Sequence, residues 1–261
     1  MPPAGNMEWT WKDMTMSKTE IQLDRDNAVA ILTLNRPAKR NALTVGMAED
    51  ISKICDQIDR DAGIGALVVR GAGGSFCAGA DRSVLNEVSG DPTRGDHFQM
   101  LGAIYQCFAR IGSLAVPVIA AVRGAAVGAG LNLLLAADIR LISENARLLS
   151  GFLAIGIHPG GGHFRLITRL AGRETAAAMA ICSEEISGTR AVEIGLAWQA
   201  LPDDQVEAKA VEMAHKAAKD PALSRFAVRS LRHLSEIPWD VALEAETSAQ
   251  MWSLRRRPST L

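Results

Sequence analysis

The sequence predicts an α/β fold in which helices are layered against a sheet. A unit made of an apolar strand, a turn of small residues and a helix occurs twice, at 65–83 and 115–137. Apolar runs of strand length stop before Gly160, and helical patterns follow it towards the C-terminus. The chain has 261 residues, of which 48% are hydrophobic, so it can bury a sizeable core between such layers.

The N-terminal elements can be read from periodicity. Alternation of apolar and polar residues on both sides of Asp26 and Asn27 predicts a β-hairpin. Apolar residues then recur at helical spacing, which predicts a helix over 44–60 with Thr44 as its N-cap. The apolar run at 65–71 is typical of a strand that is buried on both faces.

The later elements follow the same pattern. A mixed segment extends to about Thr93. We then expect a helix over 96–111, a strand over 115–122, a short buried helix over 131–137, a strand over 138–143, and helices beyond Gly160, including one after Pro221 and one after Pro238.

Composition excludes several classes of protein. The formal net charge of -1 gives no electrostatic reason to expect nucleic acid or a membrane surface as a partner. No apolar stretch reaches the roughly 18 residues of a transmembrane helix. His158 and His163 share a Pro- and Gly-rich loop without a neighbouring carboxylate, so no metal site is expected. The cysteines form no C-x-x-C pair, which favours a reducing cytoplasm and buried free thiols at Cys55, Cys77, Cys107 and Cys182.

Two turns of small residues are the candidates for function. RGAGGSFCAGADRS at 70–83 and RGAAVGAG at 123–130 each connect a buried strand to a helix. Amides at helix N-termini lack intrahelical partners, so one amide from each turn could converge on one oxygen as an oxyanion hole. The alternative is that Gly and Ala merely permit tight turns and close packing. The chain lacks the G-x-G-x-x-G dinucleotide fingerprint after its first strand, the G-K-[ST] of a P-loop and the G-x-S-x-G of a serine-hydrolase elbow.

Four motifs occur in the order found in one known superfamily. LNRPAKRNAL, SFCAGADRS, AAVRGAAVGAGLNLLLAADIRLIS and GIHPGGG together resemble the crotonase (enoyl-CoA hydratase/isomerase) superfamily over about residues 19–250. The resemblance implies a crotonase-like spiral of ββα units over 19–200 and a C-terminal helical trimerisation region over 201–261. It leaves 1–18 as an N-terminal extension, which we expect to be flexible. The expected assembly is a homotrimer or a dimer of trimers in the cytoplasm, acting in fatty acid metabolism.

The resemblance also assigns roles to residues. It implies that the backbone N–H groups of Ala80 and Ala129 bind the thioester oxygen of an acyl-CoA or enoyl-CoA substrate. Coenzyme A enters as part of that substrate, and no prosthetic group is implied. Asp81 is expected to cap the helix that follows it and to line the adenine pocket. The full set of implied substrate and coenzyme A contacts is Lys39, Arg40, Ala42, Ala78, Ala80, Asp81, Arg82, Ser83, Phe152 and Gly160.

The chain departs from the family at the positions of proton transfer. Hydratases of this family use two glutamates around one water molecule, and here those positions hold Asn132 and Phe152. Neither side chain exchanges a proton near neutral pH, and each lost acid or base costs about 10²–10⁴-fold in rate. Efficient hydration by the two-glutamate mechanism is therefore not expected.

Other groups are candidates for a replacement acid or base. His163, at a helix start beside the acyl pocket, is a candidate base whose pKa the helix N-terminus would lower, or else it caps that helix or packs structurally. Asn132 is a candidate for orienting a water or a carbonyl, or else it bonds within its helix. His158, after the strand-like LAIGI, is expected to be structural. Near the C-terminus we expect Trp239 and Trp252 to pack and the basic 255–257 to be solvated. The segment over the acyl pocket carries four titratable residues, most of them expected at the surface: Glu87, Asp91, Asp96 and His97.

Three functional hypotheses follow. The first is an enzyme acting on coenzyme A thioesters, a lyase or isomerase of the enoyl-CoA hydratase type. It would stabilise a thioester enolate in a hydration-like, isomerising, decarboxylating or hydrolytic reaction. The second is a non-catalytic acyl-CoA-binding protein, which an apolar ring at Phe152 favours. The third is a serine peptidase on a related spiral fold, for which no Ser–His–Asp pattern can be identified in the sequence.

Overall fold

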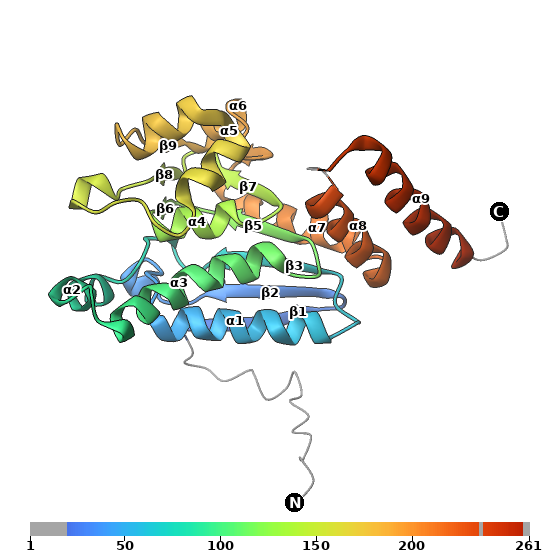
Figure 1. Cartoon of the computed structure of the whole chain (residues 1–261), viewed down its shortest axis with the longest axis horizontal. Coiled ribbons are helices and arrows are strands. Elements are labelled where there is room, and N and C mark those ends of the chain that lie inside the picture. The colour runs from blue at the N-terminus through green and yellow to red at the C-terminus, as the bar shows by residue number, and fades with distance from the viewer. Residues whose placement is uncertain (1–19, 235–236, 258–261) are drawn as a thin grey trace, which may run out of the picture.

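The computed structural model describes residues 20–234 and 237–257. The extension predicted over 1–18 lies outside the described residues. The chain forms two sheets with helices packed on them (Figure 1), which confirms the predicted α/β class.

A six-stranded sheet forms the centre of the molecule, in the order β1-β2-β3-β5-β7-β10. The predicted hairpin pairs β1 with β2 in antiparallel fashion, and Asn27 in its turn has a φ of 54°. The other neighbours pair in parallel. The strands are β1 (Ile21–Asp26), β2 (Val29–Leu34), β3 (Ala66–Gly71), β5 (Val118–Val122), β7 (Ile139–Ser143) and β10 (Gln199–Leu201).

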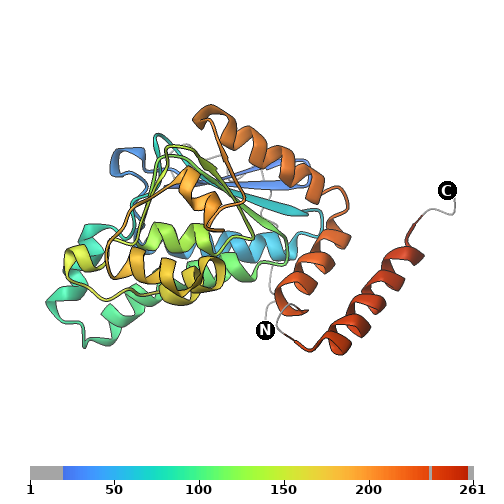
Figure 2. The same ribbon diagram turned by 90° about the horizontal axis from the view of Figure 1, so that it is seen from above.

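Helices cover both faces of this sheet (Figure 2). The larger core lies under α1 (Val45–Arg60) and α3 (Gly95–Ser113), which pack against each other. The smaller core lies under α7 (Val206–Ala217), whose buried face contacts β3 and β5. As predicted, the Thr44 side chain caps α1 by accepting a hydrogen bond from the Met47 amide at 3.1 Å.

A second sheet of short strands adjoins the first, in the order β4-β6-β8-β9. It consists of β4 (Ser75–Cys77), β6 (Ala125–Val127), β8 (Arg147–Leu149) and β9 (Ile186–Ser187). The first three strands pair in parallel, and β4 and β6 run directly into the two turns of small residues. This sheet therefore carries both candidate turns on neighbouring strands.

Two predictions about elements were wrong. Strands β9 and β10 both lie beyond Gly160, because tertiary pairing with β8 and β7 makes strands of two or three residues with no periodicity of their own. The helix expected after Asp81 is present as α2 (Arg82–Gly90), within the mixed segment before Thr93. The strand-like residues before His158 form a 3-10 helix, Leu153–Ile155, which ends at Gly156 in the left-handed conformation.

The remaining helices are α4 (Ala129–Leu135), α5 (His163–Ala180), α6 (Gly188–Glu193), α8 (Pro221–Leu234) and α9 (Trp239–Arg255), with further 3-10 turns at Pro37–Lys39 and Asp203–Gln205. Helix α9 projects from the body (Figure 1) and buries none of its residues. Trp239 is exposed, whereas the Trp252 ring stacks on Phe226 of α8 with centroids 4.1 Å apart. No helix among the described residues is long and apolar enough to cross a membrane.

The cysteine prediction holds for three of the four thiols. Cys55, Cys77 and Cys107 are free and buried, and burial raises the pKa of Cys55 and of Cys77 to about 12. Cys182 is exposed, contrary to the prediction, because it follows the end of α5 at the surface.

Candidate active site

Two backbone amides at the ends of neighbouring strands define the site. Ala80 follows β4 and forms a β-bridge with Leu43. The Leu43 amide donates to the Gly79 carbonyl, and the Leu43 carbonyl accepts from the Asp81 amide, both at 2.8 Å. Among the described residues, the Ala80 amide itself donates no backbone hydrogen bond. Ala129 is the first residue of α4, where an amide has no intrahelical acceptor. Both N–H groups are therefore available to an oxygen atom.

Glycines bring these two turns together. Gly79 has a φ of 101°, and a Cβ on it would lie 2.9 Å from the Val127 carbonyl oxygen and 3.7 Å from the Ala129 nitrogen. A Cβ on Gly130 would lie 2.2 Å from the Cys77 carbonyl oxygen. Any side chain at either position would separate the turns, which explains the small residues in the sequence.

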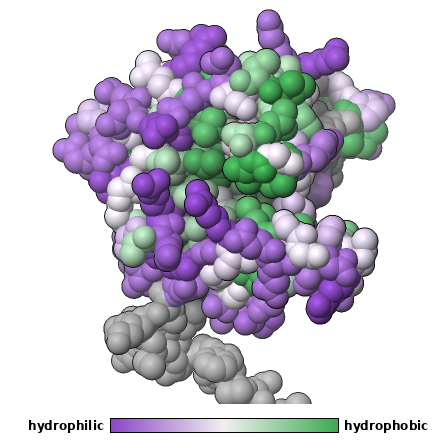
Figure 3. Space-filling view, turned by 90° about the vertical axis from the view of Figure 1, so that its left-hand side faces the viewer, coloured by the Kyte–Doolittle hydropathy of each residue, from purple (hydrophilic) through white to green (hydrophobic). Residues whose placement is uncertain are grey.

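A pocket of about 90 Å³ opens beside the two amides. It lies between the turns and apolar side chains of α2 and α3, and it includes Ser150. The space-filling view of the side of the molecule that carries α2 shows apolar residues gathered within a polar surround (Figure 3). The lining residues that the sequence did not single out are Leu85, Leu101, Ile104, Tyr105, Ser150, Ile155 and Ile157.

Behind the pocket, three buried side chains are joined by hydrogen bonds. His163 Nδ1 lies 2.7 Å from Asn132 Oδ1, and His163 Nε2 lies 2.7 Å from Ser150 Oγ. Asn132 Nδ2 donates to the Gly160 carbonyl at 2.9 Å. His163 is 1% exposed, and burial lowers the pKa of its imidazole to about 4. The direction of the shift agrees with the expectation, and its cause is the desolvation of the buried ring.

Phe152 closes this network from the pocket side. Its ring meets the His163 ring edge-on, with centroids 4.9 Å apart. A Cβ on Gly128 would lie 3.7 Å from Phe152 Cζ, so the ring also reaches the turn before Ala129. The two positions at which the resemblance implies glutamates thus hold an amide engaged with buried partners and an apolar ring.

The residues expected at the coenzyme A end lie around the first turn. Lys39 and Arg40 are exposed, Arg40 is in the left-handed conformation, and neither has an ion-pair partner among the described residues. Ala78 donates its amide to the Arg40 carbonyl at 2.9 Å, which fixes this loop against the turn. Ala42 is half-buried, and Arg82 and Ser83 are exposed.

Asp81 caps α2, as predicted, by accepting from the Ser83 amide at 3.0 Å. It also forms an ion pair of 2.9 Å with Arg36, a partner that the sequence did not suggest. The hydrogen bond from the Ser83 amide is the main cause that lowers the pKa of Asp81.

The four titratable residues expected over the acyl pocket are not among the residues that line it. Glu87, Asp91 and Asp96 are exposed, as predicted. His97 is buried, contrary to the prediction, since its Nδ1 bonds the Asp91 carbonyl at 2.7 Å and its ring packs into α3. His158 is exposed, and its Nδ1 lies 2.8 Å from the Pro159 carbonyl oxygen. No group of three metal-ligating side chains occurs within residues 20–234 and 237–257.

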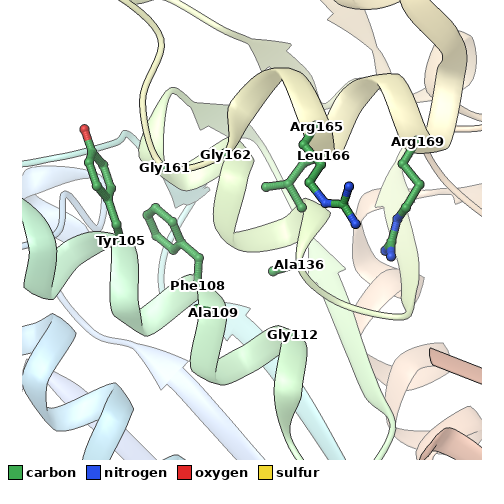
Figure 4. Close-up of a pocket in the computed structure, with 10 residues that line it drawn as sticks. All are labelled: Tyr105, Phe108, Ala109, Gly112, Ala136, Gly161, Gly162, Arg165, Leu166 and Arg169. Atoms are coloured by element: carbon green, nitrogen blue, oxygen red, sulfur yellow. The ribbon is translucent and has the colours of Figure 1, made fainter. Parts of the chain in front are cut away.

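A second, larger pocket of about 550 Å³ begins where the first ends. Tyr105 lines both pockets. Figure 4 shows Tyr105 and Phe108 on α3 facing Arg165 and Arg169 on α5 across this space. A Cβ on Gly160 would lie 2.3 Å from Tyr105 Oη, so the phenol packs tightly against the loop before α5.

The fold and the paired amides define the class of protein, and comparisons with known proteins agree. The family model described as enoyl-CoA hydratase/isomerase matches residues 24–253. The chain is 37% identical over 234 residues to a protein of Mycobacterium tuberculosis named "Probable enoyl-CoA hydratase", covering 90% of this chain and 89% of that one. It is 32% identical to the 1,2-epoxyphenylacetyl-CoA isomerase of Escherichia coli, covering 86% of each.

A solved structure gives the same result at the level of the fold. The crystal structure of an enoyl-CoA hydratase from Bacillus anthracis matches with a TM-score of 0.83 and 30% identity, covering 92% of each chain. The chain therefore belongs to the enoyl-CoA hydratase/isomerase (crotonase) family and has its crotonase-like α/β fold.

Proposed function

We propose that this chain binds an acyl-CoA or enoyl-CoA thioester and polarises its carbonyl between the amides of Ala80 and Ala129. The convergence of two turns whose glycines permit no side chain, at the edge of an apolar pocket, supports this role most directly. Two donors aimed at one oxygen stabilise the charge that develops when the thioester forms an enolate or a tetrahedral adduct.

The coenzyme A part of the substrate would lie along the loop that precedes Asn41. Lys39 and Arg40 are two exposed cations whose side chains form no ion pair with the residues that the structure describes, and such cations form charge-assisted hydrogen bonds with phosphate. The other proposed contacts with the substrate and coenzyme A are those that the resemblance implies: Ala42, Ala78, Ala80, Asp81, Arg82, Ser83, Phe152 and Gly160. No prosthetic group enters the proposal, and the assembly proposed is a cytoplasmic homotrimer or dimer of trimers.

Hydration of a double bond is not the reaction that this site supports. Asn132 has its oxygen bonded to His163 and its nitrogen bonded to the Gly160 carbonyl, so its amide is occupied by protein groups. Phe152 offers no proton at all. With both glutamates replaced, hydration of crotonyl-CoA should lie at least about 10²-fold below that of a two-glutamate enzyme.

Calorimetry with crotonyl-CoA and butyryl-CoA, together with a crotonyl-CoA hydration assay, tests the proposal. We expect binding of both thioesters with little or no hydration. Absence of binding would contradict the proposed function, and efficient hydration would contradict the roles given to Asn132 and Phe152. Binding without turnover of any thioester would favour the alternative, a non-catalytic acyl-CoA-binding protein, which the apolar Phe152 ring supports.

A further inference from the structure

Ser150, His163 and Asn132 form a buried chain that the family comparison does not explain. Ser150 and Asn132 are both 0% exposed, and His163 lies between them with one ring nitrogen 2.7 Å from each partner. These side chains come from three separate segments: the end of β8, the start of α5 and the middle of α4. Their contacts therefore depend on the complete fold.

The hydrogen-bond pattern fixes where the protons are. Asn132 Nδ2 donates to the Gly160 carbonyl, so Oδ1 is the atom that faces His163 and can only accept. His163 Nδ1 must then carry the proton, and in the neutral ring Nε2 has a free lone pair. The Ser150 hydroxyl donates to that lone pair. This is the tautomer in which a histidine can take a proton from a serine.

The same serine lies beside the oxyanion amides. The Leu149 carbonyl accepts from the Gly128 amide at 3.0 Å, which places the end of β8 next to the start of α4. Ser150 and Ala129 are the residues that follow this bond in each segment, and both line the small pocket together with Ala80. The nucleophile and the oxyanion donors thus line one cavity, and the base lies behind the nucleophile, within hydrogen-bond distance of it.

We propose that Ser150 is an acyl-accepting nucleophile, with His163 as its general base and Asn132 as a positioning residue. Ser150 Oγ attacks the carbonyl carbon of a coenzyme A thioester while its proton moves to His163 Nε2. The C–S bond then breaks, and the departing thiolate takes that proton. Water subsequently attacks the Ser150 ester through the same base, so thioester and water yield a carboxylic acid and coenzyme A thiol. This inference rests on the proposed function, since the same amides hold the thioester.

Two features of the site set the expected rate. Asn132 orients the imidazole but carries no charge to stabilise the imidazolium, so turnover should lie below that of a triad with a carboxylate at this position. The Phe152 ring packs on His163, and Ser150 has no exposed surface, so an acyl group reaches Oγ only when the side chains around it move aside. We therefore expect slow hydrolysis, over minutes, with the acyl-serine detectable as an intermediate.

The experiment uses the full chain with Cys182→Ser, because the exposed thiol of Cys182 would accept acyl groups by itself. The protein is mixed with acetyl-CoA, butyryl-CoA or hexanoyl-CoA. Thiol release is followed with a chromogenic disulfide, and quenched samples are mapped by peptide mass spectrometry. We expect release of coenzyme A and an acyl adduct on the peptide that contains Ser150.

Single substitutions test the role that each residue has in the proposed steps. Ser150→Ala should remove the adduct and lower thiol release by at least about 10³-fold. Ser150→Cys should still become acylated, which keeps the test valid if the alanine variant folds poorly. Asn132→Leu should lower kcat and move the acid limb of its pH profile while leaving the acyl-CoA dissociation constant unchanged. Ser224→Ala, which removes another buried hydroxyl bonded to a distant backbone carbonyl, is the matched control and should behave like the parent.

The outcomes separate this inference from the proposed function. Acyl-CoA binding without thiol release or an adduct would overturn the role of Ser150 and leave thioester binding intact. Thiol release that survives Ser150→Ala at the parent rate would likewise overturn it. Absence of acyl-CoA binding would instead remove the proposed function, and with it the substrate of this chemistry.

Discussion

Replacing Ala129 with proline would test the oxyanion hole without altering a side-chain function. Proline is well tolerated at the first position of a helix because the amide there has no intrahelical acceptor, and Ala129 is the first residue of α4. The substitution removes one of two N–H donors and puts a methylene in its place. One such donor contributes about 3–4 kcal/mol to the transition state, which corresponds to about 10²–10³-fold in rate.

The assay for Ala129→Pro has two readouts. Infrared difference spectra of bound butyryl-CoA, labelled with ¹³C at the carbonyl, should show a higher carbonyl stretching frequency than in the parent, because a donor is lost. The rate of coenzyme A thiol release should fall by about 10²–10³-fold. Gly95→Pro is the matched control: it is also the first residue of a helix, it is exposed, and a Cβ there meets nothing within 4 Å. An unchanged carbonyl frequency and rate in Ala129→Pro would refute the oxyanion role of this amide.

Four further predictions concern separate parts of the molecule. As pH falls from about 6.5 to about 4, the unfolded chain protonates His163 while the folded chain resists it, so stability should drop by about 3 kcal/mol; urea titrations at several pH values should show this loss, and His163→Gln should lack it. Replacing Lys39 and Arg40 together with alanine should weaken coenzyme A binding by about tenfold and reduce its salt dependence, as measured by calorimetry; equal affinity would place the phosphates elsewhere. Tyr105→Ala should join the two pockets and shift thioester binding towards longer acyl chains, which a chain-length series would detect, whereas an unchanged preference would show that the pockets act separately. Only Cys182 should react quickly with a chromogenic disulfide in the folded protein, so more than one fast thiol would contradict the burial of the others.

The sequence predicted those parts of the site that depend on local chemistry. Thr44 and Asp81 precede helices and cap them, as their side chains allow. The two glycine turns follow buried strands. Their Gly and Ala residues indicate that main-chain atoms must approach one another closely there. Motif order over most of the chain identified the family.

Other features depend on tertiary contacts that no local pattern encodes. Ser150 lies in an unremarkable LLSGF segment, and its importance arises only because the fold brings His163 to within 2.7 Å of it. Strand β9 has two residues and exists only because β8 offers it a partner. His97 was misplaced because its ring bonds a carbonyl six residues earlier, which a surface pattern does not reveal.

The contact between Gly130 and the Cys77 carbonyl has a consequence for how this site can change. Because a Cβ there would lie 2.2 Å from that oxygen, the distance between the two turns is set by main-chain atoms in contact. The side chains at 150 and 152 line the cavity and those at 132 and 163 lie behind it, but none of them holds the turns apart. Their exchange therefore alters which proton moves and which atom attacks while the carbonyl stays in the same place. Protein engineering could therefore vary those four positions while keeping the glycine contact unchanged.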